Sequence, residues 1–97
     1  NKVYVYENLK IDYSARIVYI NNERLDMTPK EYDLLTYLIK NENMAITREE
    51  LLSKVWGYDF YSDDRTLDTH MKLLRRKLGE YGKNIVTLRG VGYRFEK

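Results

Sequence analysis

The stretch from Asp64 to Leu78 places cations, a hydroxyl group and an apolar side chain on one side of an expected helix. At about 100° per residue, that side carries Arg65, Thr69, Lys72, Leu73 and Arg76. Cationic and hydroxyl side chains bind phosphates and base edges, and an apolar side chain can cover a thymine methyl group. The pattern predicts a helix that enters the DNA major groove. The alternatives are a solvated basic face and, for Leu73, packing against the preceding helix.

The opposite side of the same helix is apolar, with Leu67, Met71, Leu74 and Leu78 spaced i, i+4, i+7 and i+11. We expect this stripe to be buried in the core. The helix therefore has one packing side and one binding side.

A second basic feature is the sequence RGVGYRF, which begins at Arg89. Gly90 and Gly92 permit a tight hairpin turn, which would carry Arg89 at its tip. A long cation at a narrow tip suits the DNA minor groove. The alternative is a solvated turn arginine, and we expect Tyr93 and Phe95 to be core residues.

Three further residues have both a functional and a structural interpretation. Arg48 stands at a helix start, where a docked phosphate or a nearby glutamate would offset its unfavourable place in the helix dipole. His70 lies beside the apolar stripe, so it either contacts a phosphate or is half-buried. We expect Trp56 mainly in the core, with an N–H that donates to a phosphate as the alternative.

Acidic and aromatic side chains gather just before the basic helix. They are Tyr58, Asp59, Phe60, Tyr61, Asp63 and Asp64. Exposed aromatic groups beside acids suit a protein partner, whereas helix capping alone would explain Asp63 or Asp64.

Short alternating segments at the start of the chain predict four antiparallel strands. They cover Val3–Tyr6, Leu9–Asp12, Arg16–Ile20 and Glu23–Met27. The period then changes, and capping boxes at Thr28 and Thr47 each open a helix. The three expected helices run from Thr28 to near Asn41–Asn43, from Thr47 to a stop at Gly57, and from Asp63 or Asp64 to about Leu78. A short strand at Ile46, a break at Gly79–Gly82 and a hairpin of Ile85–Leu88 with Gly92–Phe95 complete the chain.

These elements predict one α+β domain over residues 1–97. It is a winged helix-turn-helix with an N-terminal four-stranded antiparallel sheet, three helices and a C-terminal hairpin wing. Because the chain begins with Asn1, we expect it to be part of a longer protein.

Charge is distributed unevenly along the chain. Residues 1–64 hold 8 basic and 12 acidic side chains, whereas residues 65–97 hold 9 basic and 3 acidic ones. A basic C-terminal third indicates a polyanionic partner.

Other classes of protein fit poorly. One histidine and no cysteine predict no metal site, and the lack of cysteine is compatible with a reducing compartment such as the cytoplasm. We also expect no cofactor. No apolar run reaches the length of a membrane helix. No nucleophile–histidine–acid set or phosphate-binding glycine loop indicates an enzyme. The main alternative is a winged-helix protein-interaction module that does not bind DNA.

Five motifs, in order, resemble the OmpR/PhoB family of response-regulator output domains. They are TPKEYDLL from Thr28, REELL from Arg48, VWG from Val55, DRTLDTH from Asp64 and RGVGYRF from Arg89. The resemblance implies a two-component transcription factor whose phosphorylated receiver domain lies upstream of this chain. It also implies two copies, head-to-tail, on a direct repeat.

The resemblance further implies residue roles. The DNA contacts would be Arg48, Trp56, Arg65, Thr66, Thr69, His70, Lys72, Leu73, Arg75, Thr87 and Arg89. The loop with Tyr58, Asp59, Phe60, Tyr61 and Asp63 would contact RNA polymerase. Leu73 and Lys72 stand where some relatives carry arginine, so the target sequence is expected to differ from theirs.

Overall fold

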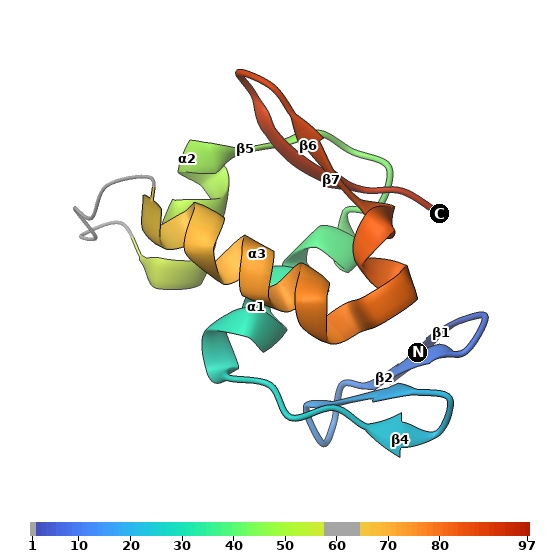
Figure 1. The fold of residues 1–97 in the computed structure, drawn as a ribbon. Helices are drawn as coiled ribbons and strands as arrows, with labels where there is room; N and C mark the ends of the chain where they lie inside the picture. Colours follow the sequence, from blue (N-terminus) through green and yellow to red (C-terminus); the bar gives the residue numbers. More distant parts are fainter. Residues whose placement is uncertain (1, 58–64) are drawn as a thin grey trace.

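Figure 1 shows the fold in a computed structural model, which describes residues 2–57 and 65–97. The strands are β1 (Val3–Tyr6), β2 (Leu9–Asp12), β3 (Ile17–Ile20), β4 (Glu23–Arg24), β5 (Ile46–Thr47), β6 (Ile85–Leu88) and β7 (Gly92–Phe95). The helices are α1 (Pro29–Lys40), α2 (Arg48–Leu51), the π-helical turn η1 (Leu52–Trp56), α3 (Arg65–Leu78) and the 3-10 helix η2 (Gly79–Asn84).

The N-terminal strands form the expected antiparallel sheet, in the order β1-β2-β3-β4. Two predicted bounds are wrong. Strand β3 begins at Ile17 because Arg16 has a φ of 56°, a turn conformation. Strand β4 ends at Arg24 rather than Met27. The Leu25 N–H still donates to the Val18 carbonyl at 2.8 Å, after which the chain leaves the sheet for α1.

Helix α1 begins with the predicted capping box. The Thr28 hydroxyl accepts from the Glu31 N–H at 3.2 Å, and the Glu31 carboxylate accepts from the Thr28 N–H at 2.9 Å. Both bonds satisfy backbone donors that the first turn of a helix leaves unpaired.

The second predicted helix is confirmed in place but not in type. Thr47 caps it by accepting from the Glu50 N–H at 3.1 Å, and Gly57 ends it with a φ of 112°. Between them, one α-helical turn changes into the π-helical turn η1. The apolar pattern of so short a segment does not distinguish i→i+5 from i→i+4 pairing.

The predicted break after α3 is a 3-10 helix, η2. Its tight course needs Gly82, because a Cβ there would collide with the Arg75 carbonyl. Tyr81 is buried in the same turn. Short 3-10 segments carry little periodic signal, which explains the missed element.

The wing has the predicted bounds. Strands β6 and β7 pair from Ile85 opposite Phe95 to Leu88 opposite Gly92, and β5 joins the outer side of β7. A Cβ at Gly92 would collide with the Ile46 carbonyl, so glycine lets β5 approach the base of the wing.

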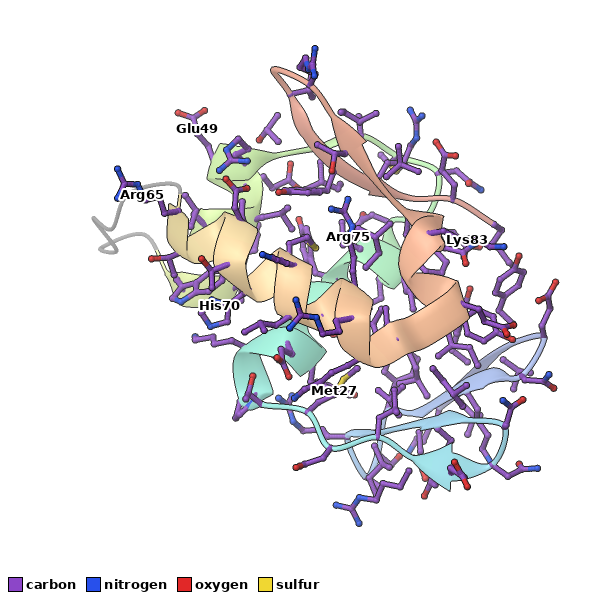
Figure 2. All side chains as sticks on the ribbon, in the orientation of Figure 1. Met27, Glu49, Arg65, His70, Arg75 and Lys83 are labelled. Atoms are coloured by element: carbon purple, nitrogen blue, oxygen red, sulfur yellow. The ribbon has the colours of Figure 1, made fainter. Side chains whose placement is uncertain are left out.

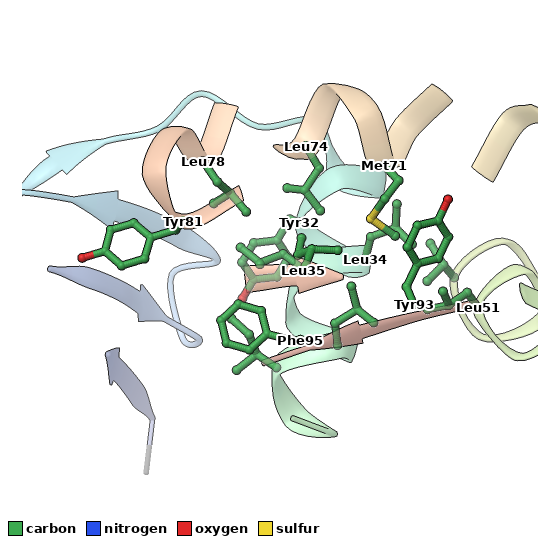
Figure 3. Close-up of a cluster of buried hydrophobic side chains, with 14 of the residues drawn as sticks. Tyr32, Leu34, Leu35, Leu51, Met71, Leu74, Leu78, Tyr81, Tyr93 and Phe95 are labelled. Atoms are coloured by element: carbon green, nitrogen blue, oxygen red, sulfur yellow. The ribbon is translucent and has the colours of Figure 1, made fainter. Parts of the chain in front are cut away.

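The core confirms how α3 is rotated. Leu67, Met71, Leu74 and Leu78 are each at most 1% exposed. Figure 3 shows Met71, Leu74 and Leu78 of this stripe facing α1, together with Tyr93 and Phe95 of β7, the two wing aromatics that the sequence assigned to the core. The other side of α3 is therefore turned toward solvent.

Candidate nucleic-acid interface

The predicted binding side of α3 is exposed. Arg65, Thr69, Lys72, Leu73 and Arg76 all face solvent, and Figure 2 shows Arg65 pointing away from the body of the domain. Leu73 is 40% exposed, so a large part of its side chain is not covered by the preceding helix. An apolar side chain surrounded by exposed cations is suited to a surface that becomes covered on binding.

The wing ends in the expected exposed cation. Arg89 is exposed, and the turn closes when Gly90 takes a φ of 77° and the Val91 N–H donates to the Leu88 carbonyl at 2.9 Å. Val91 beside it is 44% exposed. The tip thus presents a long cation next to a small apolar side chain.

Arg48 is paired with a carboxylate of α3. Its guanidinium Nη1 lies 2.8 Å from the Asp68 carboxylate, which also accepts from the Tyr93 hydroxyl at 2.6 Å. The Arg48 hydrogen bond holds the pKa of Asp68 below its usual value, against a smaller opposing effect of burial. Burial, aided by Asp68, raises the pKa of Tyr93, so its hydroxyl stays a donor.

Arg75 and Thr87 are brought together between α3 and the wing. The Arg75 guanidinium donates to the Ile85 carbonyl at 3.1 and 2.9 Å and to the Thr87 hydroxyl at 2.6 Å. Figure 2 shows Arg75 pointing from α3 toward the wing. Both residues therefore build the joint between these two elements.

His70 and Trp56 are half-buried neighbours. Their rings meet edge to face with centroids 5.1 Å apart, and the His70 Nδ1 lies 2.8 Å from the Thr66 carbonyl. Because a carbonyl only accepts, Nδ1 carries a proton in this arrangement. Trp56 packs against the core, as expected, with the Lys30 ammonium 5.6 Å from its ring centroid.

Sequence reasoning missed Asp68 and the Tyr93 hydroxyl as parts of this surface. The available signal was an acidic side chain within an otherwise basic helix. The predicted polymerase residues Tyr58, Asp59, Phe60, Tyr61 and Asp63 lie outside the described residues, as does Asp64.

Residues 2–57 and 65–97 lack two features that are typical of other protein classes. No group of three His, Cys, Asp or Glu side chains there could hold a metal ion. No helix in residues 2–57 and 65–97 is long and apolar enough to cross a membrane.

Comparison with known proteins identifies the family. The family described as "Transcriptional regulatory protein, C terminal" matches residues 22–95. The chain belongs to this family. Its members are transcriptional regulators rather than enzymes, and the expectation of a response-regulator DNA-binding domain is confirmed.

Relatives and solved structures agree with the family. The transcriptional regulatory protein SrrA of Staphylococcus aureus is 48% identical over 95 residues, covering 94% of this chain and 39% of SrrA. The response regulator AdeR DNA-binding domain, solved in complex with an intercistronic region, has a TM-score of 0.84 and 33% identity, covering 97% of this chain and 99% of that one. Thermotoga maritima DrrB, an OmpR/PhoB homologue, has a TM-score of 0.90 and 30% identity, covering 100% of this chain and 45% of DrrB.

These likenesses confirm the α+β winged-helix fold and the OmpR/PhoB resemblance. The chain spans about two fifths of the length of the curated relatives that it matches.

Proposed function

We propose that the domain binds double-stranded DNA, with α3 in the major groove and the wing in the minor groove. The observation that carries the proposal is the two-sided character of α3. One side is buried, and the other presents Leu73, 40% exposed, among cations. The AdeR DNA-binding domain, which has the same fold, was crystallised in complex with an intercistronic region, and this supports DNA binding by the present chain.

The exposed residues divide by chemistry. Thr69 and Leu73 are short or apolar and suit base edges, so we assign them sequence preference. Arg65, Lys72 and Arg76 suit phosphates and supply affinity. Arg89 suits a narrow A·T-rich minor groove, as a cation on a tight turn.

The remaining proposed contacts border this surface. They are Arg48, Trp56, Thr66, His70, Arg75 and Thr87. Arg48 and Arg75 are engaged with Asp68 and the wing, so their contribution includes holding these elements in place. A phosphate would meet guanidinium groups that are already oriented.

The direct test is titration with mixed-sequence duplex at two salt concentrations, followed by selection from a random duplex pool. We expect binding that weakens steeply with salt and an enriched sequence with an A·T-rich flank. Failure to bind any duplex at low salt would overturn the proposal. It would favour the alternative of a protein-interaction module.

We further propose that two copies bind a direct repeat head-to-tail. A single α3 covers only part of a site. A copy bound to one half-site raises the effective concentration of DNA-bound partner for a second copy at the neighbouring half-site. Half-sites should be roughly 10–10.5 base pairs apart. Inverting one half-site, or inserting half a helical turn (about 5 base pairs), should abolish paired binding. Undiminished paired binding to either altered site would contradict this arrangement.

The remaining proposals concern the whole protein, because the relatives of this chain are longer than the chain itself. We propose a phosphorylated receiver domain upstream, action in the cytoplasm, and contact between residues 58–63 and RNA polymerase. Photo-crosslinkers placed at Tyr58 and Tyr61 on promoter-bound protein should capture a polymerase subunit. Crosslinks to DNA alone would contradict the polymerase contact.

A further inference from the structure

We propose that Asp68 and Arg75 form a clamp on Tyr93 that fixes the wing to α3 at one angle. The clamp would make the wing a rigid extension of the recognition helix. Asp68, Arg75 and Tyr93 are then positioning residues for recognition in both grooves. The effect of the clamp on recognition rests on the proposed mode of DNA binding, whereas the geometry of the clamp is independent of that proposal.

The placement of Asp68 needs a physical reason. It lies on a helix whose other charged residues are all basic. Arg65, three residues before it, and Lys72, four residues after it, are its neighbours on the helix surface and are proposed phosphate contacts. A carboxylate there repels phosphates. Its side chain is 52% exposed, so its ion pair with Arg48 contributes little to folding stability. Stability alone therefore accounts poorly for this carboxylate, whereas orientation of its partners accounts for it.

Tyr93 receives both arms of the clamp. Its ring is 4% exposed in the core, and its hydroxyl donates to Asp68 at 2.6 Å. The Arg75 guanidinium carbon lies 5.4 Å from the centroid of the same ring. Because Asp68 and Arg75 are two helical turns apart, they share one face of α3.

The two arms hold different strands of the wing. Asp68 holds β7 through Tyr93, and Arg75 holds β6 through the Ile85 carbonyl and the Thr87 hydroxyl. The Arg48 N–H also donates to the Val91 carbonyl at 3.2 Å. Both strands are therefore attached along α3, and the turn is attached to α2.

A rigid wing has a consequence for recognition. The distance along the duplex between the major-groove and minor-groove contacts would be set before binding, which reduces the entropy lost on docking. Wing contact would then add its full contribution only when the A·T-rich flank lies at the correct spacing.

The first test uses the unbound chain and needs no DNA. Tyr93→Phe removes only the hydroxyl, and Asp68→Asn removes only the charge. Residual dipolar couplings of α3 and of the wing should fit one alignment tensor in the wild type and require two in both variants. The control is Asp33→Asn, which breaks a similar ion pair with Arg16 (3.0 Å) on α1 and should leave one tensor. A separate wing tensor in the wild type, one shared tensor in the variants, or two tensors in the control would overturn the clamp.

The second test measures coupling on DNA. Arg89→Ala should reduce duplex affinity in both backgrounds. The fold-reduction should be at least about threefold larger in the wild type than in the Tyr93→Phe variant. Shifting the A·T-rich flank by one base pair should also penalise the wild type more than Tyr93→Phe. Equal losses in both backgrounds would overturn the coupling. Absence of duplex binding by the wild type would instead overturn the proposed function and leave the dipolar-coupling result to decide the clamp.

Discussion

Helix α3 carries a carboxylate–cation pair near each end, and the two pairs differ in burial. Toward the N-terminal end, Asp68 lies 2.8 Å from Arg48 with 52% of its side chain exposed. At the C-terminal end, Lys77 lies 2.7 Å from Glu31, whose side chain is 3% exposed. The chemistry is the same, but an exposed pair orients its partners at little gain in stability, whereas a buried carboxylate that loses its partner lowers the stability of the fold.

The buried pair is part of a larger set of contacts. Glu31 also accepts from the Thr28 N–H in the capping box, and Lys77 donates to the Asp26 carbonyl at 2.8 Å. Burial acts to raise the pKa of Glu31, but the Lys77 and Thr28 hydrogen bonds outweigh it and leave the pKa lowered. One ion pair thus joins the start of α1, the end of α3 and the segment that leaves the sheet.

The apolar stripe between the two pairs should give the largest effect. Leu74 is fully buried, so Leu74→Ala should lower the free energy of unfolding by about 2–5 kcal/mol in chemical denaturation. The exposed Leu73→Ala on the same helix is the matched control and should change it by less than about 1 kcal/mol. Equal effects of the two substitutions would mean that α3 is rotated from the orientation described.

Removing the cation at each end compares the two pairs directly. Lys77→Met leaves the buried Glu31 carboxylate without its main partner, so it should cost about 1–3 kcal/mol of stability. Arg48→Met acts on the exposed carboxylate and should cost less than about 1 kcal/mol. If denaturant titration ranks the two variants in the opposite order, burial does not distinguish their roles.

Acid should sharpen the same contrast. Because the folded pKa of Glu31 is lowered, its stabilisation is complete above its unfolded pKa of about 4.3 and is lost as pH falls through the folded value. A plot of melting temperature against pH should therefore be flatter for Glu31→Gln than for the wild type across this acidic range. Asp68→Asn should flatten the plot less, since solvent screens its pair. Wild-type and Glu31→Gln curves of equal slope would contradict this assignment.

The exposed side of α3 should act on DNA affinity without affecting folding. Lys72→Ala should reduce the salt slope of duplex binding by about 0.9, the value for one lost phosphate contact. Lys10→Ala, on the exposed outer sheet, is a control of equal charge and should leave the slope unchanged. A Lys72 variant with an altered base preference and an unchanged slope would move this residue from phosphates to base edges.

The sequence was sufficient for features that depend on local period and capping. The α3 stripe, the Thr28 capping box and the bounds of the wing follow from spacing and turn chemistry, and all are confirmed. The same local rules do not predict which hydrogen-bond spacing a short helical segment takes. The π-helical turn η1 and the 3-10 helix η2 were therefore missed.

The contacts of the candidate site were harder to predict than its residues. Arg48 is separated from Asp68 by 20 positions, and Tyr93 by 25 positions from the same carboxylate. No local pattern pairs residues at such separations, because the pairing depends on how α2, α3 and the wing meet. The exposed cations could be predicted since exposure follows from helical period alone.

Recognition by α3 and the wing together is tested most directly by titrating isotopically labelled protein with the selected duplex and recording amide chemical shifts at each step. We expect the largest shifts at Thr69 and Leu73 on α3 and at Arg89 and Gly90 in the wing, appearing together at the same duplex concentration. Strands β1–β4 should shift little. Shifts confined to the N-terminal sheet, or to α3 without the wing, would contradict recognition by the two elements together.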